Sequence, residues 1–265
     1  MLGGTKVYMP EKINREGETT KDKNGTNMKI IKYKNYDDIF VEFLDEYHAV
    51  IHSDYDKFKR KSIKNPYFPS VYGVGYLGQG KYNAVENGKV TIQYNYWKAM
   101  MQRCYCKSIN KHTFAYNNVS VCKEWHNFQN FAKWFDENFY SVSGEKMSLD
   151  KDILKRGNTV YSPETCIFVP MKINQLFIKN KTVRNSNLCI GVRYNKNKNK
   201  YQAQCGTSDE KRVKTICCVD TLEEAFNKYK EYKENLIKSF ALQYKDKIPN
   251  KLYKAMMSYE VLITD

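Results

Sequence analysis

Residues 147–177 read MSLDKDILKRGNTVYSPETCIFVPMKINQLF, in which two short apolar groups precede a segment with helical character. β-Branched and apolar residues predict strands at 147–153 and 165–169, with Gly157 and Asn158 forming a turn between them. Pro170 favours the start of a helix that runs through Phe177, because the first turn of a helix does not need the missing N–H. We therefore expect two strands and a short helix at the centre of the chain.

Two helices rich in aromatic residues are predicted before this segment. The first spans residues 94–105, where the apolar side chains fall on one face. The second spans residues 121–135 and carries an apolar stripe at helical spacing, which is typical of core packing rather than of a ligand site. The apolar faces contain Trp97, Met100, Met101 and Cys104 in the first helix, and Trp125, Phe128, Phe131, Ala132 and Phe135 in the second.

Strand patterns occur on both sides of these helices. Upstream, residues 28–33 and 39–43 are rich in β-branched and aromatic residues, and 35–38 form the turn between them. Downstream, a polar linker is expected at 179–187, followed by three strands. These strands are predicted at 189–194, 201–205 and 213–219, with helices at 221–243 and 251–259 after them. Thr221 caps the longer helix, with Glu224 three residues on.

The predicted fold class is α+β, with three modules. Residues 1–85 form a small β-rich module, 86–180 hold the central hairpin and aromatic helices, and 181–265 form a three-stranded sheet plus helix.

The charge of the chain favours a polyanionic partner. The 265 residues include 44 Lys or Arg and 29 Asp or Glu, a formal net charge of +15. Such a field raises the local concentration of nucleic acid, although a Lys-rich surface that is merely solvated has the same composition. No run of about 18 apolar residues is present, so no membrane span is expected. The first 27 residues lack a signal-peptide pattern, which favours a cytoplasmic protein.

The eight cysteines follow no spacing of a secreted domain, so we expect reduced thiols. Cys104, Cys106 and Cys122 admit a zinc interpretation. Zinc sites usually have a second pair of ligands, and the sequence offers none at a matching spacing. Buried core thiols are the preferred interpretation.

A set of short motifs extends in order from Trp97 to Asn174. It comprises Trp97-x-x-Met100, Arg103-Cys-Tyr105, Val121-Cys-Lys-Glu-Trp125, Asn127-Phe128, Phe131-x-x-Trp134, Leu149-Asp-Lys-Asp152, Gly157-Asn158, Tyr161-Ser-Pro-Glu-Thr-Cys166 and Ile173-Asn174. This set, about 80 residues long, resembles a phage-type HNH endonuclease family, whose members cleave DNA at a ββα-metal site. The resemblance implies one Mg²⁺ or Mn²⁺ ion held by Asp150 and Asn174, with Asp152 as an outer acid.

Oxygen ligands of this kind suit such a cation, which would neutralise charge on the scissile phosphate. If residues 147–177 form the hairpin and helix, Asp150 and Asn174 can converge despite their separation along the chain. The alternative for Asp150 and Asp152 is that they are exposed acids at the end of a strand.

The chain departs from the commonest family pattern at two positions. Lys151 stands where a His usually acts as the general base, and Thr165 replaces the middle Asn. An unperturbed Lys has a pKa near 10.4, so Lys151 suits contact with a phosphate better than proton abstraction. The remaining candidates for a base are His126, His112 and a water activated by the metal. His126 lies among core aromatics, where a structural role is favoured.

A second set of motifs lies near the C-terminus: Gly191-Val-Arg-Tyr194, Lys200-Tyr-Gln-Ala203, Asp220-Thr-Leu-Glu-Glu-Ala225 and Tyr229. It resembles the ethylene-response-factor (apetala-two) type of DNA-binding domain, which implies a three-stranded sheet against the major groove and a helix behind it. Arg and Gln can contact base edges and Lys can hold phosphates. The residues expected to contact DNA are Arg193, Tyr194, Lys196, Lys198, Lys200, Gln202 and Gln204.

The residues behind this second resemblance have an alternative explanation, and the sequence also departs from the family pattern. A basic hairpin that is merely solvated would contain the same residues. Tyr and Cys also replace most of the Trp residues that are usual in this family, which leaves base-specific contact open.

A further basic segment lies at residues 57–68, where Arg60, Lys61 and three other lysines alternate with aromatic residues. It predicts contact with a nucleic-acid backbone or stacking on bases. A solvated loop beside a small core fits the same residues equally well.

These patterns together predict a DNA-binding protein, with a metal-dependent HNH-type endonuclease acting on duplex DNA as the leading hypothesis. A phage origin would place it in the host-cell cytoplasm. The alternative, favoured by Lys151 and Thr165, is a non-catalytic DNA-binding protein or an inhibitor of a host protein on a degenerate scaffold. An RNA-binding module is the third hypothesis, because charge alone does not separate the two nucleic acids.

Overall fold

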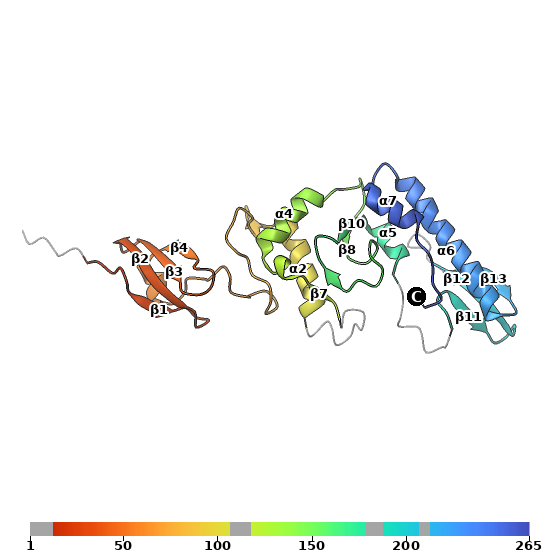
Figure 1. Cartoon of the computed structure of the whole chain (residues 1–265), viewed down its shortest axis with the longest axis horizontal. Coiled ribbons are helices and arrows are strands. Elements are labelled where there is room, and N and C mark those ends of the chain that lie inside the picture. Colours follow the sequence, from red (N-terminus) through yellow and green to blue (C-terminus); the bar gives the residue numbers. More distant parts are fainter. Residues whose placement is uncertain (1–12, 107–117, 179–187, 207–212, 265) are drawn as a thin grey trace, which may run out of the picture. The chain divides into compact units, whose positions relative to one another are not determined.

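The computed structural model describes residues 13–106, 118–178, 188–206 and 213–264, and these residues form two compact units. Unit 1 contains the described residues of Met1–Ala84 together with Asn127–Gln129, and unit 2 contains those of Val85–His126 and Asn130–Asp265. Helices occur together with small sheets, so the fold class is α+β as predicted (Figure 1). Among the described residues, none of the helices combines the length and the apolar character that crossing a bilayer requires.

Unit 1 is built on an antiparallel sheet with the order β1-β2-β3-β4. The strands are β1 (Thr19–Lys21), β2 (Asn27–Asn35), β3 (Asp38–Phe43) and β4 (Val50–Ser53). The predicted strands and turn at 28–43 are confirmed in β2 and β3, whereas β1, β4 and helix α1 (Tyr55–Lys59) were not predicted. Alternate residues of β2 and β3, such as Ile30 and Val41, are fully buried in the core of this unit.

Unit 2 begins with a two-stranded ribbon and helix α2. Strands β5 (Val85–Glu86) and β6 (Lys89–Val90) precede α2 (Ile92–Tyr105), and Thr91 caps the helix by accepting the N–H of Tyr94 at 3.4 Å. The helix and its buried face were both predicted correctly, since Trp97, Met100, Met101 and Cys104 are buried.

The helix predicted at 121–135 is wrong in its first half. The chain forms strand β7 (Ser120–Val121) and a 3₁₀ turn at Lys123–His126, and helix α4 (Phe128–Asn138) begins only after them. The carbonyl of Trp125 accepts the indole N–H of Trp97 at 2.7 Å. In a continuous helix this carbonyl would instead accept a backbone N–H from the next turn. The aromatic stripe is nevertheless buried, as its spacing predicted.

The centre of unit 2 contains the predicted strands and short helix. Strand β8 (Met147–Asp150) pairs antiparallel with β10 (Ile167–Pro170), and helix α5 (Met171–Leu176) follows directly. Strand β8 is shorter than predicted because the chain turns at Asp150. A further strand, β9 (Val160–Tyr161), lies in the connecting loop and pairs in parallel with β7.

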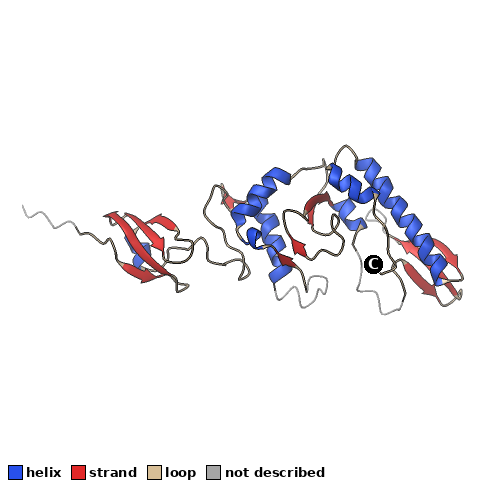
Figure 2. Ribbon diagram, in the orientation of Figure 1, coloured by secondary structure: helices blue, strands red, loops and turns tan. Residues whose placement is uncertain are grey.

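The C-terminal part of unit 2 is a three-stranded sheet covered by a long helix (Figure 2). The three predicted strands are present as β11 (Val192–Asn195), β12 (Lys200–Cys205) and β13 (Lys214–Val219), and they pair antiparallel in that order. Helix α6 (Leu222–Tyr244) begins at its predicted cap, where Thr221 accepts the N–H of Glu224 at 3.2 Å. Helix α7 (Asn250–Met257) ends the described elements.

Helix α6 contributes to two apolar clusters. Near its start, Phe226 and Tyr229 pack against Ala203 and Cys205 of the sheet. Farther along, its residues join a second cluster with α5 and α7, which Figure 1 shows beside it. The second cluster includes Ile173, Leu176, Ile237, Ala241, Leu252 and Met256. The linker predicted at 179–187 lies outside the described residues, but α5 and α6 on either side of it share one core.

Candidate functional site

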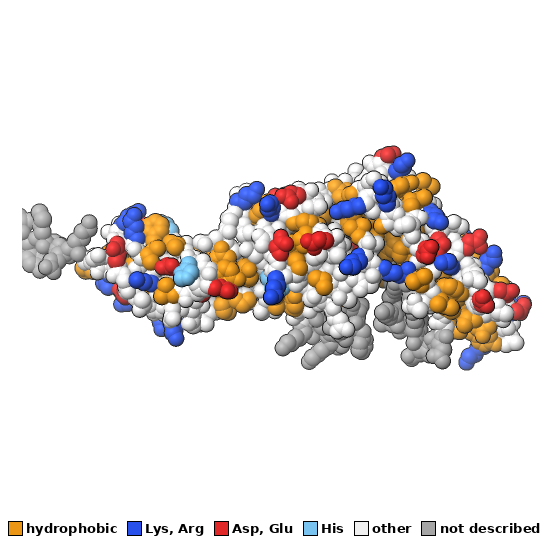
Figure 3. Space-filling model, viewed as in Figure 1, with side chains coloured by type: hydrophobic (Ala, Val, Ile, Leu, Met, Phe, Trp, Pro, Cys, Tyr) orange, Lys and Arg blue, Asp and Glu red, His pale blue; other side chains and the backbone are white. Residues whose placement is uncertain are grey.

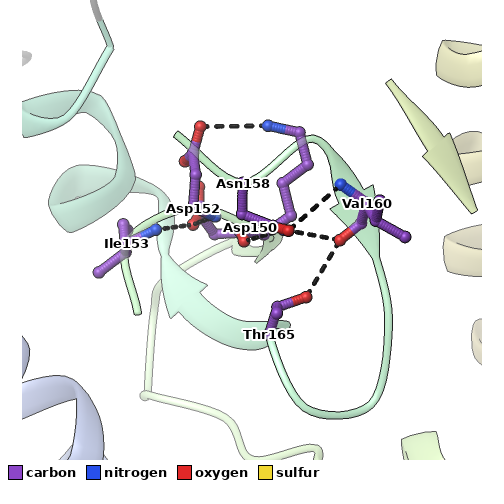
Figure 4. Close-up of polar contacts among 7 residues, drawn as sticks. Asp150, Asp152, Ile153, Asn158, Val160 and Thr165 are labelled. Carbon is purple, nitrogen blue, oxygen red and sulfur yellow. Dashed lines mark hydrogen bonds and ion pairs between the residues drawn. The ribbon is translucent and has the colours of Figure 1, made fainter. Parts of the chain in front are cut away.

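Asp150 ends β8, and its carboxylate closes the turn that follows. Its Oδ1 accepts the backbone N–H groups of Asp152 at 2.9 Å and Ile153 at 2.8 Å (Figure 4). Burial, and secondarily the neighbouring Asp152 carboxylate, raises the pKa of Asp150 to about 6. The group is therefore mainly ionised at neutral pH, in surroundings that disfavour its charge. A cation at the carboxylate would relieve that cost.

Lys151 and Asp152 form an ion pair beside Asp150, with 3.1 Å between Lys151 Nζ and Asp152 Oδ2. The Lys151 side chain is only 13% exposed, and its Nζ lies 6.0 Å from the centroid of the Tyr161 ring. The ammonium thus contacts a carboxylate and lies against an aromatic face. A side-chain cation in this position is suited to contact an anion such as a phosphate oxygen.

Asn158 ties together the two ends of the loop that follows β8. Its Nδ2 donates to the carbonyl of Lys151 at 2.7 Å and to the carbonyl of Val160 at 2.6 Å (Figure 4). Thr165 adds a third bond, from its Oγ1 to the carbonyl of Val160 at 3.0 Å. Asn158 was predicted as a turn residue and belongs to the HNH-like motif set, without a task assigned to its side chain. Its Gly-Asn spacing gave no signal for this second role, which depends on where the loop returns.

Asn174 lies on α5, and its Nδ2 donates to Ser148 Oγ at 3.2 Å. Ser148 and Asp150 are two residues apart on β8 and so project from the same, half-buried face of the strand. The amide oxygen of Asn174 and Oδ2 of Asp150 accept no hydrogen bond within the described residues. Carboxylate and amide oxygens are the kinds of ligand that Mg²⁺ or Mn²⁺ accepts. Within the described ranges, no three His, Cys, Asp or Glu side chains gather as a metal cluster, so the amide and water would complete the set.

His126 lies at the end of the 3₁₀ turn, beside Tyr105, with 6.3 Å between ring centroids. Its Nε2 is 3.1 Å from the carbonyl of Val121. A carbonyl oxygen can only accept, so this nitrogen carries the proton and serves a structural bond. His112, the other candidate base, lies outside the described residues. The Cys104 thiol considered for zinc is buried, and burial raises its pKa to about 11.

The C-terminal sheet has one face against α6 and one open face. Arg193, Gln202 and Cys218 are paired across the three strands, and they project from the face opposite the buried Ala203 and Cys205. Cross-strand hydrogen bonds orient both glutamines on the open face. Gln202 Nε2 donates to Cys218 Sγ at 3.3 Å, and Gln204 Nε2 donates to Thr215 Oγ1 at 3.3 Å.

Four other predicted DNA-contacting residues occupy different places. Tyr194 lies on the helix-facing side of the sheet, where it packs against Tyr201 with 5.1 Å between ring centroids. Lys196 and Lys198 are exposed in the turn between β11 and β12. Lys200 forms an ion pair with Asp220, with 3.2 Å between Nζ and Oδ1. Arg193, Gln202 and Gln204 therefore share one face, and Tyr194 does not share it.

The basic segment of unit 1 is less continuous than the sequence predicted. Arg60, at the end of α1, is ion-paired with Asp56, and Lys61 is exposed beside it. Phe58, which was expected to alternate with these charges, is buried in the core, and Tyr67 stacks on Tyr47 with ring centroids 4.2 Å apart.

On the face shown in Figure 3, Lys and Arg side chains stand in small groups with Asp and Glu among them in both units. The excess positive charge is therefore not gathered into one basic patch on this face. Contact with a polyanion would depend on the particular side chains described above.

Comparison of the chain with protein-family models, with curated proteins and with solved structures found no match.

Proposed function

We propose that this protein binds duplex DNA and hydrolyses its phosphodiester bonds as a metal-dependent endonuclease of the HNH type. The observation that carries the proposal is the arrangement of β8, β10 and α5. Asp150 and Ser148 share one face of β8, and Asn174 of α5 contacts Ser148 on that face. This arrangement supports a site in which one carboxylate, one amide oxygen and the Lys151 ammonium act on a phosphate, as phosphoryl transfer requires.

Asp150 and Asn174 would hold a Mg²⁺ or Mn²⁺ ion, which when bound supplies positive charge against the scissile phosphate and the leaving oxygen. The residues of the chain have separate tasks around it. Asp150 is held by two backbone N–H groups, so its second oxygen has a fixed direction. Lys151 would contact a phosphate oxygen, and Asn158 holds the carbonyl of Lys151 so that the loop keeps its course.

The open face of the C-terminal sheet would supply the main duplex contact. Gln202 and Gln204 are oriented by cross-strand bonds, and paired amide groups can read base edges in the major groove. Arg193 in the same row adds a positive charge. The proposed partner is duplex DNA rather than RNA, because an A-form major groove is too narrow and deep for a sheet to enter.

The test is nicking or cleavage of plasmid DNA with Mg²⁺ or Mn²⁺, by wild type, Asp150→Ala and Asp37→Ala. Asp37 is an exposed acid in the β2–β3 turn and serves as the matched control. We expect wild type and Asp37→Ala to cut and Asp150→Ala to be inactive. A wild-type protein that leaves plasmid intact with every divalent metal would contradict the endonuclease.

A second candidate, a non-catalytic DNA-binding protein or an inhibitor of a host protein, is favoured by one observation. The Asp150 carboxylate already serves the fold by closing its turn, and Lys151 is engaged with Asp152. Under this alternative, duplex binding is salt-sensitive and unchanged in Asp150→Ala. Absence of any DNA affinity at low salt would favour the protein partner instead.

A further inference from the structure

Arg103 lies in the last turn of α2, and its guanidinium Cζ is 5.4 Å from the centroid of the Tyr161 ring. Its Nε is buried and has no hydrogen-bond partner among the described residues. An Arg fork carries five N–H donors, and leaving one of them buried without an acceptor costs free energy. The fold therefore tolerates an unsatisfied donor at this position.

A second cation lies against the same ring. Lys151 Nζ is 6.0 Å from the Tyr161 centroid, although Lys151 follows Arg103 by 48 positions in the chain. Both charges also act on the buried Cys104 thiol, where each opposes the rise in pKa that burial causes. Two cations from distant segments thus lie against one ring, and one of them, Lys151, directly follows Asp150 in the chain.

A second Arg–Tyr contact in unit 2, between Arg156 and Tyr259, serves as a comparison because its Arg also bonds to the backbone. Arg156 Cζ also lies 5.4 Å from an aromatic centroid, that of Tyr259. Its NH1 donates to the carbonyl of Glu260 at 2.8 Å, and the residue is exposed. Arg103 makes the same ring contact, but its buried Nε has no acceptor among the described residues.

We propose that Arg103 and Lys151, which both lie against the Tyr161 ring, form a phosphate-binding site in which the ring restricts the orientation of the guanidinium. Two parallel N–H donors of an Arg match two phosphate oxygens, and the Lys ammonium adds a point charge. The ligand is a phosphodiester of the DNA backbone next to Asp150. The inference rests on the proposed DNA function, but phosphate binding here does not require cleavage.

The experiment measures duplex DNA affinity by fluorescence anisotropy as a function of NaCl, in EDTA so that no metal contributes. The variants are Arg103→Met and Arg103→Lys, with Arg156→Met and Arg156→Lys as matched controls. We expect Arg103→Met to weaken binding roughly tenfold and to reduce the salt slope by about one. Arg103→Lys should keep the slope and lose part of the affinity, since charge remains without the fork. Both Arg156 variants should bind as wild type does.

Folding is checked in each variant by tryptophan fluorescence, because all three Trp residues (97, 125 and 134) belong to unit 2. If Arg103→Met does not fold, the DNA affinities of Arg103→Lys and Arg156→Lys are compared instead. A lower affinity in Arg103→Lys alone supports the phosphate site. Folded Arg103 variants with wild-type affinity and slope would overturn the phosphate site. If wild type binds DNA but never cuts it, the endonuclease fails, while a reduced slope in Arg103→Met still supports the site. A wild-type protein without DNA affinity contradicts both.

Discussion

The side-chain amide of Asn158 donates to the backbone carbonyl of Lys151 at 2.7 Å, across a loop of seven residues. The same amide reaches the carbonyl of Val160 at 2.6 Å, so one side chain fixes both sides of the loop. Lys151 is held at its backbone by this bond and at its ammonium by Asp152. One amide thus connects the two ends of the loop that follows Asp150.

Replacing Asn158 with Ala should destabilise unit 2 by about 1–3 kcal/mol, because the carbonyl of Lys151 loses its side-chain donor and that of Val160 keeps only Thr165. Asn158→Asp should cost more, since a carboxylate would face two carbonyl oxygens. Urea unfolding followed by tryptophan fluorescence measures both. Asn235→Ala, at an exposed position of α6, is the control and should change stability little. Equal stability of wild type and Asn158→Ala would mean that the hydrogen bonds of the Asn158 amide do not stabilise the loop.

Asp150→Asn should stabilise the protein at alkaline pH. The folded protein raises the pKa of Asp150 from its ordinary 3.8 to about 6, so it holds this proton more tightly than the unfolded chain does. The resulting stability is fully present below pH 3.8 and is lost as pH rises through about 6. Asparagine keeps an oxygen for the two N–H groups without the charge.

We expect Asp150→Asn to exceed wild type by about 1–3 kcal/mol at pH 8 and to show little difference near pH 4. Urea unfolding at pH 4, 6 and 8 checks this, with Asp37→Asn as the control at an exposed acid. A stability difference that does not change with pH would show that ionisation of Asp150 does not destabilise the folded protein.

Mg²⁺ or Mn²⁺ should raise the thermal stability of wild type at pH 7, because bound metal stabilises only the folded state. At a concentration ten times Kd the gain is about 1.4 kcal/mol, or about 2–5 °C in Tm. Asp150→Asn and Asn174→Leu should each lose most of this shift, which differential scanning fluorimetry measures. An equal shift in Asp150→Asn would place the cation elsewhere.

Cys218 should be the thiol that reacts fastest with iodoacetamide, and saturating duplex DNA should protect it. Cys218 is exposed on the open face beside Gln202, whereas Cys217 packs toward α6. Cys166 is buried, and burial raises its pKa to about 12, so it should react slowly in any case. Peptide mass spectrometry with and without DNA gives the rates, with Cys217 as the internal control. Unchanged Cys218 labelling under saturation would contradict the sheet as the DNA contact.

Local patterns were sufficient for most of the elements. The two-residue alternation of Tyr201, Ala203 and Cys205 identified a strand with one buried face, and Thr221 identified the start of α6. The pattern failed at 121–135 because the indole of Trp97, distant in the chain, takes the carbonyl of Trp125. The spacing of residues within 121–135 carries no information about this contact, because Trp97 lies outside the segment.

The candidate site was predictable in part. Asp150 and Asn174 came from a family resemblance, and only the fold relates Asn174 to Ser148, on the same face of β8 as Asp150. Tyr194 was expected to contact DNA together with Arg193, although adjacent residues of a strand point to opposite faces. Asn158 and Arg103 depend on long-range contacts, so their proposed tasks had no signal in local spacing.

The apolar cluster shared by α5, α6 and α7 restricts how this protein can be divided. Ile173 and Leu176 flank Asn174 on α5, and their burial depends on Ile237 of α6 and Leu252 of α7. A fragment ending near residue 180 would leave these side chains facing water and would release the helix that carries Asn174. Recombination that exchanged the C-terminal region for an unrelated one would therefore have to supply a replacement for this packing, or lose the amide with it.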